Sequence, residues 1–130
     1  MKILNASQIR EIDVFTIKNE PVASIDLMER AAKKCFEWIR RHMKKHETVK
    51  IFCGMGNNGG DGLVIGRMLA GTGRKTIVYK VLHSERPSED FAINEKRLNG
   101  IKNLKYDTIS NDDELPQIAH GDLVIDAMLG

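Results

Sequence analysis

The chain has 130 residues, with 20 lysines and arginines, 18 aspartates and glutamates, and a formal net charge of +2. A chain of this length forms one domain with its own core, and so small a net charge argues against nucleic acid as a partner. Two cysteines, and no run of about 18 apolar residues, argue against a disulfide scaffold and a membrane-spanning helix and favour the cytoplasm. We therefore expect residues 1–130 to form a single domain.

Two helices are predicted before the first strand. Apolar residues at helical spacing indicate one helix from Ser7 to about Lys18, and a longer apolar stripe indicates another from Ser24 to about Lys45. Basic residues gather near the end of the second helix, and we interpret them as a solvated helix end: Arg40, Arg41, Lys44, Lys45 and Lys50.

Strands and helices alternate from Thr48 onward. We predict strands over 49–53, 75–82, 104–109 and 123–125, and helices over 61–70, 88–99 and 114–119. Such alternation with short connections is typical of an α/β protein, here a Rossmann-like three-layer sandwich with a mainly parallel sheet, right-handed crossovers and helices on both faces. Because doubly wound sheets usually continue past a fourth strand, we expect the domain to be incomplete at Gly130.

A glycine run, Gly-Met-Gly-Asn-Asn-Gly-Gly-Asp-Gly, extends from Gly54 to Gly62 between the first strand and the next helix. Glycine disfavours ordered structure by roughly 0.5 to 1 kcal/mol relative to alanine, but it permits positive φ angles and close backbone approach. The amides of such a run, with the N-terminus of the helix, can bind an anion or a polar ligand. The predicted sheet brings this run beside the end of the fourth strand, from Asp126 to Gly130, where doubly wound sheets bind ligands.

The glycine run also contains the dinucleotide pattern G-x-G-x-x-G, at Gly54, Gly56 and Gly59, which on its own indicates an NAD-dependent dehydrogenase. Such an enzyme has an acidic residue at the end of the second strand to hold the ribose, and the segment 79–83 has none. Asp61 would also repel a phosphate at the helix start. The ATP-type phosphate loop is excluded because no Gly-Lys-Ser/Thr sequence follows.

Polar residues of this region are candidate functional residues. Asp61 is either a helix N-cap or a carboxylate facing the ligand crevice, and Asp126 is either a solvent-facing strand end or a functional carboxylate. Asn57 and Asn58 are either turn residues or ligand contacts, and two in succession inside a glycine run favour ligand contacts. The histidines have no metal-ligand spacing, and we interpret them as structural.

Three motifs together resemble the NAD(P)H-hydrate epimerase family, also called the YjeF N-terminal domain. They are the run from Gly54 to Val64 with Arg67, the segment from Val124 to Ala127 followed by Gly130, and Leu27-Met28-Glu29-Arg30-Ala31-Ala32. They occur in the order found in that family and span nearly the whole chain.

The resemblance implies an isomerase that interconverts the R and S epimers of hydrated NADH and NADPH at nicotinamide C6. An ADP- or ATP-dependent dehydratase, fused to the epimerase in many bacteria, then acts on the S epimer and removes the added water, which restores NADH or NADPH. The resemblance also implies a potassium ion and a homodimer. By the same resemblance, the substrate contacts are Asn57, Asn58, Gly59, Gly60, Asp61 and Gly130, the potassium ligands include Asn58 and Asp126, and the candidate acid and base are Asp61 and Asp126.

The sequence departs from the family in one respect. Family members continue beyond the equivalent of Gly130 and include a later Asp-x-Pro-Ser-Gly segment, which this sequence lacks. We therefore expect the 130-residue chain alone to have little epimerase activity. The alternative to an epimerase is a protein of another functional class, a non-catalytic ligand-binding or scaffold domain of the same fold.

Overall fold

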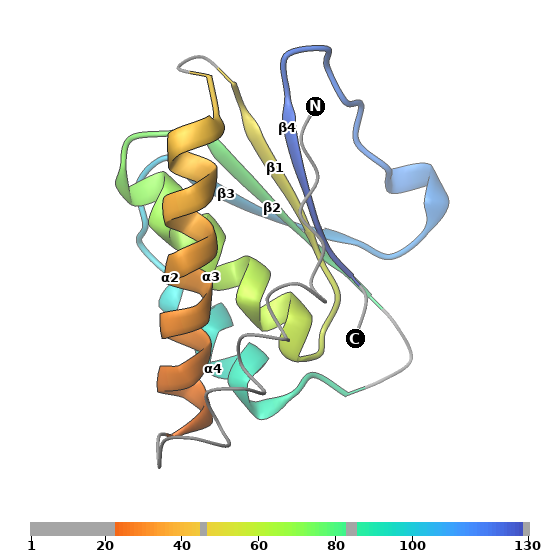
Figure 1. Ribbon diagram of the computed structural model, residues 1–130. Helices are drawn as coiled ribbons and strands as arrows, with labels where there is room; N and C mark the ends of the chain where they lie inside the picture. The colour runs from red at the N-terminus through yellow and green to blue at the C-terminus, as the bar shows by residue number, and fades with distance from the viewer. Residues whose placement is uncertain (1–22, 45–46, 83–85, 129–130) are drawn as a thin grey trace.

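The computed structural model describes residues 23–44, 47–82 and 86–128, and the helix predicted over 7–18 lies outside them. Strands and helices alternate from the first strand onward, as predicted (Figure 1). The elements in chain order are α2 (Ser24–His42), β1 (Val49–Cys53), α3 (Asn57–Gly71), β2 (Thr76–Val81), α4 (Glu89–Arg97), β3 (Leu104–Ile109), the 3-10 turn η1 (Asp112–Glu114) and β4 (Leu123–Ala127).

The described residues form a sheet of four parallel strands in the order β3-β2-β1-β4. The chain moves from β1 to β2 to β3 in one direction and then crosses back to place β4 on the other side of β1. The direction of winding therefore reverses between β1 and β4, and the predicted switch point is confirmed. Because parallel strands end at the same edge, the carboxyl ends of β1 and β4 lie next to each other.

The described helices α2, α3 and α4 lie on one face of the sheet (Figure 1). Helix α3 packs on the sheet, and α2 and α4 both pack on α3. Two right-handed crossovers in the same direction, from β1 to β2 and from β2 to β3, place their helices on the same face. The parallel α/β fold is thus confirmed, with α3 at its centre.

The connection between β3 and β4 contains η1 in place of the helix predicted over 114–119. The Asn111 side chain accepts a hydrogen bond from the backbone N–H of Asp113 at 3.0 Å, which closes a single turn. Pro116 follows, and a proline has no N–H for helical hydrogen bonding and disfavours helical geometry in the residue before it. A longer helix therefore does not form there.

Lys50 lies on β1 and contacts this connection, whereas the sequence suggested that it belongs to the solvated end of α2. Its Nζ lies 2.6 Å from Oδ2 of Asp122 and donates a 2.7 Å hydrogen bond to the carbonyl of Gln117. Burial raises the pKa of Asp122, but the hydrogen bonds from Lys50 and from the backbone N–H of Ala119, with the nearby positive charges, together outweigh burial, so the pKa lies below its usual value. This ion pair holds the connection against the sheet face opposite α3.

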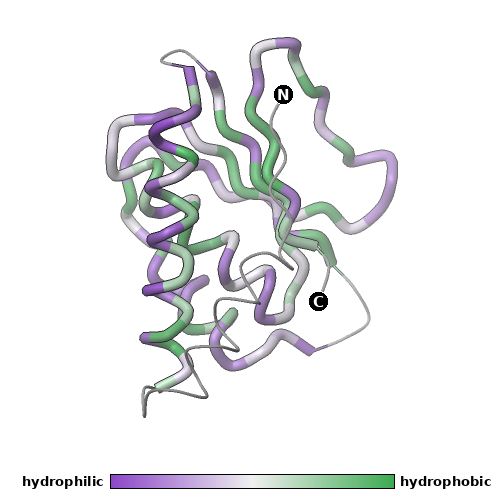
Figure 2. The backbone as a smooth tube through the Cα atoms, in the orientation of Figure 1, coloured by the Kyte–Doolittle hydropathy of each residue, from purple (hydrophilic) through white to green (hydrophobic). Residues whose placement is uncertain are grey.

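The core lies between the helices and the sheet. Figure 2 shows mainly hydrophobic residues along β1 and β4 and a mixture of hydrophobic and hydrophilic residues along α2. The apolar side of α2 meets α3, and the predicted stripe is confirmed by its buried members in this helix: Met28, Ala31, Ala32, Phe36 and Ile39. None of the described helices is both long enough and apolar enough to cross a bilayer.

Candidate functional site

The glycine run is a short turn followed directly by a helix. Helix α3 begins at Asn57, not at about Asp61 as the sequence predicted, and the N–H of Gly60 donates a 3.0 Å hydrogen bond to the carbonyl of Gly56. Among the described glycines, positive φ angles occur at Gly73 and Gly100, and none occurs within the run. A need for left-handed backbone geometry therefore does not explain why the run is rich in glycine.

Close packing instead explains Gly59 and Gly62, whereas a Cβ at Gly56 would meet nothing within 4 Å. A Cβ at Gly59 would lie 1.8 Å from the carbonyl oxygen of Gly54, so any side chain there would prevent the turn from closing. A Cβ at Gly62 would lie 2.6 Å from Sγ of Cys53 and 2.8 Å from Cβ of Ala127. Interiors are close-packed, so such contacts leave no room for a methyl group. The glycines bring the start of α3 down onto the ends of β1 and β4.

Asp61 lies inside α3 and is almost fully buried, with 1% of its surface exposed. It is not the N-cap, because Gly56 occupies that position. Of the two alternatives for Asp61, the N-cap is therefore excluded, because the helix starts earlier than predicted. Burial raises the pKa of the Cys53 thiol, and the negative charge of Asp61 raises it further.

The start of α3 presents amide side chains and an end that lacks a side-chain cap. Asn57 is exposed, whereas Asn58 is buried with 4% of its surface exposed. Gly56 supplies no capping side chain to α3, whereas Ser88 caps α4 by accepting a 3.1 Å hydrogen bond from Phe91 N. The first N–H groups of a helix carry a partial positive charge, so this end of α3 can receive a polar or anionic group.

Asp126 lies on β4 at the other side of the switch point. Its Oδ1 accepts a 3.0 Å hydrogen bond from Met128 N, and its side chain is half-buried. Ile125 and Ala127 are buried on the face that α3 covers, so alternation along the strand directs Asp126 to the opposite face. Asp61 and Asp126 therefore approach the edge of the sheet from opposite faces and are not arranged as a close pair of carboxylates.

Backbone contacts join the glycine run to two neighbouring segments. The N–H of Gly54 donates to the carbonyl of Ala127 at 3.1 Å, which holds the end of β4 against the run. The N–H of Ser88 donates to the carbonyl of Met55 at 2.8 Å, which brings the start of α4 to the same edge. The sequence did not indicate the second contact, because it depends on how α4 docks. Gly130, a predicted substrate contact, lies outside the described residues.

Oxygen atoms dominate the polar side chains at this edge. The described residues contain no group of three or more His, Cys, Asp or Glu side chains that could hold a metal ion. The Asn58 amide oxygen and the Asp126 carboxylate are instead the kind of donors that hard cations prefer. This donor set fits a cation of low charge better than a transition metal.

The dehydrogenase alternative finds no support in β2. The strand ends at Val81, and its last charged residue is Lys80, whose Nζ lies 2.8 Å from Oε2 of Glu95. An acid that could hold a ribose is thus missing from the described end of this strand.

Together these features define a Rossmann-like α/β domain with a polar site at the switch point between β1 and β4. The chain belongs to the family described as "YjeF-related protein N-terminus", which matches residues 24–130. The predicted family membership is confirmed.

Several relatives carry names that describe their activity. The chain is 31% identical over 127 residues to an NAD(P)H-hydrate epimerase of Rhodopirellula baltica, covering 98% of this chain and 51% of that protein. It is 32% identical over 127 residues to an NAD(P)H-hydrate epimerase of Limosilactobacillus fermentum, covering 98% of this chain and 58% of that protein. It is also 35% identical over 88 residues to a bifunctional NAD(P)H-hydrate repair enzyme of Moorella thermoacetica, covering 65% of this chain and 17% of that protein.

A similar fold occurs in the crystal structure of the yeast protein ynu0. The TM-score is 0.70 at 26% sequence identity, over 100% of this chain and 57% of the yeast chain. The chain spans about half the length of these two epimerases and of the yeast chain.

Proposed function

We propose that this chain supplies the N-terminal part of an NAD(P)H-hydrate epimerase site, which interconverts the R and S epimers of hydrated NADH and NADPH. The similarity to proteins of that name supports the proposal. The observation that carries it is the burial of Asn58 and Asp61 at the start of α3, beside the end of β4. Burying a carboxylate is unfavourable, and a buried carboxylate at a switch point is a natural candidate for a functional group.

We assign the start of α3 to the hydrated nicotinamide ring of the substrate. The helix end attracts polar and anionic groups, but the Asp61 carboxylate disfavours a phosphate at the same place. The exposed Asn57 and the buried Asn58 offer amide donors and acceptors to the ring substituents. Gly59 and Gly60 contribute backbone, and Gly130 begins the next stretch of contacts.

The chemistry requires a group that moves a proton at the C6 hydroxyl. Whether the ring opens at the carbinolamine or loses water to form an iminium, a proton leaves or joins this oxygen, and the reverse step on the other face returns it. A positioned carboxylate does this work as general acid and base. We propose Asp61 for this role, and Asp126 for binding the ion and the nearby part of the substrate.

A potassium ion completes the proposed site. The amide oxygen of Asn58 and the carboxylate of Asp126 would hold it, and both come from segments that meet at the end of β1. A bound cation would offset the negative charge of the carboxylates and attract the oxygen atoms of the substrate.

A dehydratase that accepts the S epimer is the proposed partner, acting in the cytoplasm. The bifunctional name of the Moorella relative supports a link between the two activities. Cys35 and Cys53 are free thiols, which is consistent with a reducing compartment. We also propose that the complete protein is a homodimer.

The test is an equilibration assay with the complete gene product. Pure R epimer of hydrated NADPH is incubated with the protein in potassium buffer, and the two epimers are separated by chromatography over time. We expect the S epimer to appear much faster than in the buffer control. An unchanged rate of appearance would overturn the proposed function.

A further inference from the structure

The start of α3 has little intrinsic tendency to be helical. Gly59, Gly60 and Gly62 all lie in its first two turns, and glycine is among the poorest helix formers. The N-cap residue Gly56 also makes no side-chain hydrogen bond that would fix the helix start. Packing against neighbouring elements must therefore hold Asn58 and Asp61 in place.

The sheet supports only one side of this segment, through Gly62. On the opposite side, Gly60 faces α2 and α4. A Cβ at Gly60 would lie 2.9 Å from Sδ and 3.0 Å from Cε of Met28, and 3.6 Å from Cα of Phe91. The end of the Met28 side chain thus lies directly over the backbone of Gly60.

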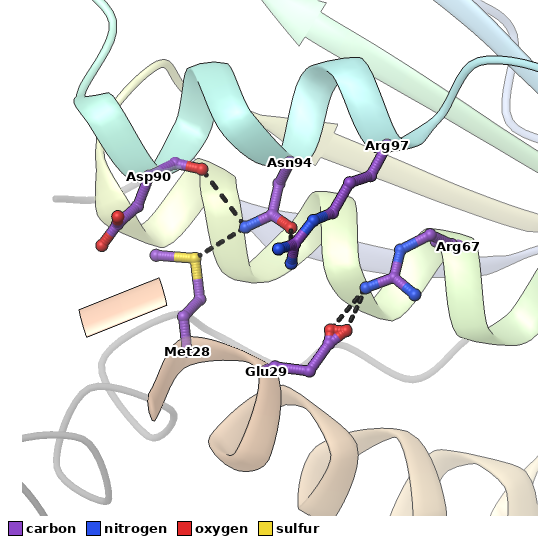
Figure 3. A network of polar contacts seen from close by, with 6 residues as sticks. All are labelled: Met28, Glu29, Arg67, Asp90, Asn94 and Arg97. Atoms are coloured by element: carbon purple, nitrogen blue, oxygen red, sulfur yellow. Dashed lines mark hydrogen bonds and ion pairs between the residues drawn. The ribbon is translucent and has the colours of Figure 1, made fainter. Parts of the chain in front are cut away.

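Contacts on two sides fix Met28. The side chain is 3% exposed, and its sulfur accepts a 3.2 Å hydrogen bond from Nδ2 of Asn94 (Figure 3). Asn94 is itself 1% exposed and also donates to the carbonyl of Asp90 at 3.2 Å. A buried amide with these partners holds one orientation, so the thioether above Gly60 is held as well.

An ion pair next to Met28 connects α2 to α3. The Glu29 carboxylate accepts hydrogen bonds at both oxygens from one guanidinium nitrogen of Arg67, which lies further along α3 (Figure 3). Met28, Glu29 and Arg67 all belong to the motifs by which the sequence resembles its family, yet neither the fold class nor the proposed chemistry assigns them a role.

We propose that Met28 is a positioning residue for the site, with Asn94 holding it in place. The thioether closes the outer side of the first two turns of α3 and thereby sets where Asn58 and Asp61 lie relative to β4. Met28 acts through Gly60 and touches no reacting atom. The effect on local order stands independently of the proposed function, and only the effect on the reaction rate rests on it.

Hydrogen exchange with mass spectrometry tests the local effect in the complete gene product. The variant is Met28→Ala, and the matched control is Met43→Ala, which truncates another buried methionine of the same apolar surface, beyond the other end of α2. We expect Met28→Ala to speed the exchange of the Asp61 to Leu63 amides by about 10-fold or more relative to peptides from β2 and β3, since local opening then precedes global unfolding. We expect Met43→Ala to leave that ratio unchanged.

Milder variants keep the test decisive if Met28→Ala does not fold. Met28→Leu keeps most of the volume, and we expect near wild-type exchange; Met28→Val removes the end of the side chain, and we expect faster exchange in the same amides. The proposal would be overturned if this exchange ratio were the same in Met28→Ala and Met43→Ala. It would also be overturned if the ratio were the same in Met28→Leu and Met28→Val.

Kinetics separate positioning from general packing. We expect Met28→Ala to lower kcat for epimerisation by about 10-fold at a temperature well below its Tm, and Met28→Leu to restore it, because misplacement of catalytic groups mainly slows the chemical step. If the wild-type protein lacks epimerase activity, the proposed function fails while the exchange result still decides the role of Met28. Unchanged kcat with faster exchange would contradict positioning for catalysis.

Discussion

Gly62 on α3 lies so close to Cys53 on β1 that a Cβ at residue 62 would come within 2.6 Å of the sulfur. The same Cβ would lie 2.8 Å from Cβ of Ala127 on β4. One glycine therefore contacts both strands of the switch point. This contact determines how deeply the start of α3, with Asn58 and Asp61, sits at the edge of the sheet.

Substituting Gly62→Ala is expected to destabilise the protein. Overpacking a well-filled core typically costs about 1–3 kcal/mol, and the gain in helix propensity of about 1 kcal/mol offsets only part of it. We predict that urea unfolding gives a free energy of unfolding lower by up to about 2 kcal/mol. The matched control is Gly71→Ala in the same helix, where a Cβ meets nothing within 4 Å, and it should be neutral or stabilising. Equal effects of the two substitutions would contradict the packing role of Gly62.

The Cys53 thiol is predicted to be unreactive in the folded protein. Burial, and then the charge of Asp61, raises its pKa, and only the thiolate reacts readily with disulfide reagents. In a Cys35→Ser variant at about pH 8, we expect labelling by a chromogenic disulfide to be at least about 100-fold slower in the native state than in guanidinium chloride. The raised pKa also means that the thiol stabilises the fold below the pKa of the unfolded chain, and that this contribution is lost as the pH rises above about 8.5. Fast labelling of the native protein would show that Cys53 is accessible.

Glu95 is predicted to make stability fall in acid. Its Oε2 lies 2.8 Å from Nζ of Lys80 and accepts a 2.5 Å hydrogen bond from the Tyr106 hydroxyl. Burial raises the pKa of Glu95, but these two hydrogen bonds and the positive charge of Lys80 together outweigh burial and bring the pKa below its usual value. Because the folded pKa is lowered, the contribution is present above the unfolded pKa of about 4.3 and is lost as the pH falls through the folded value.

The measurement for Glu95 is chemical unfolding at several pH values from about 6 down to about 3. We expect the free energy of unfolding to fall less steeply with acid in Glu95→Gln than in the wild type. The control, Glu37→Gln on the exposed side of α2, should keep the wild-type slope. If the free energy of unfolding of Glu95→Gln fell as steeply with acid as that of the wild type, the two hydrogen bonds to the Glu95 carboxylate would not stabilise the fold.

The proposed ion at Asn58 and Asp126 predicts a dependence on potassium. In the complete gene product, replacing potassium by sodium or choline at constant ionic strength is expected to slow epimerisation about 10-fold or more, because a hard cation with oxygen ligands is lost from the site. Asp126→Asn should lower the rate and remove most of this dependence. Asp107→Asn on β3, at the far side of the sheet, should retain both the wild-type rate and its potassium dependence. Full potassium dependence in Asp126→Asn would exclude Asp126 as an ion ligand.

The sequence predicted the strands and the switch point well, because both depend on strong local patterns. The alternation in 49–53 and the apolar run 123–125 became β1 and β4, although β4 extends to Ala127. The start of the helix predicted over 88–99 was also correct, since Ser88 caps α4 and capping depends on neighbouring residues alone.

The start of α3 could not be predicted, because packing there overrides local preference. Five glycines and two asparagines within 54–62 are typical of a loop, yet residues from Asn57 onward are helical. Only the structure reveals that Gly62 meets Cys53 and that Gly60 meets Met28, residues distant in sequence. The same misjudged start made Asp61 look like a cap, whereas it is a buried residue within the helix.

The most direct test of the account compares two carboxylate substitutions in the complete gene product. Asp61→Asn retains the shape of the buried side chain but removes its ability to transfer a proton, whereas Asp113→Asn changes an exposed carboxylate in η1. Starting from the pure R epimer, we predict that Asp61→Asn slows the appearance of the S epimer by about 100-fold or more, the usual range for loss of a general acid or base, while Asp113→Asn stays within about 2-fold of wild type. An Asp61→Asn variant that is folded and equilibrates the epimers at the wild-type rate would contradict the account.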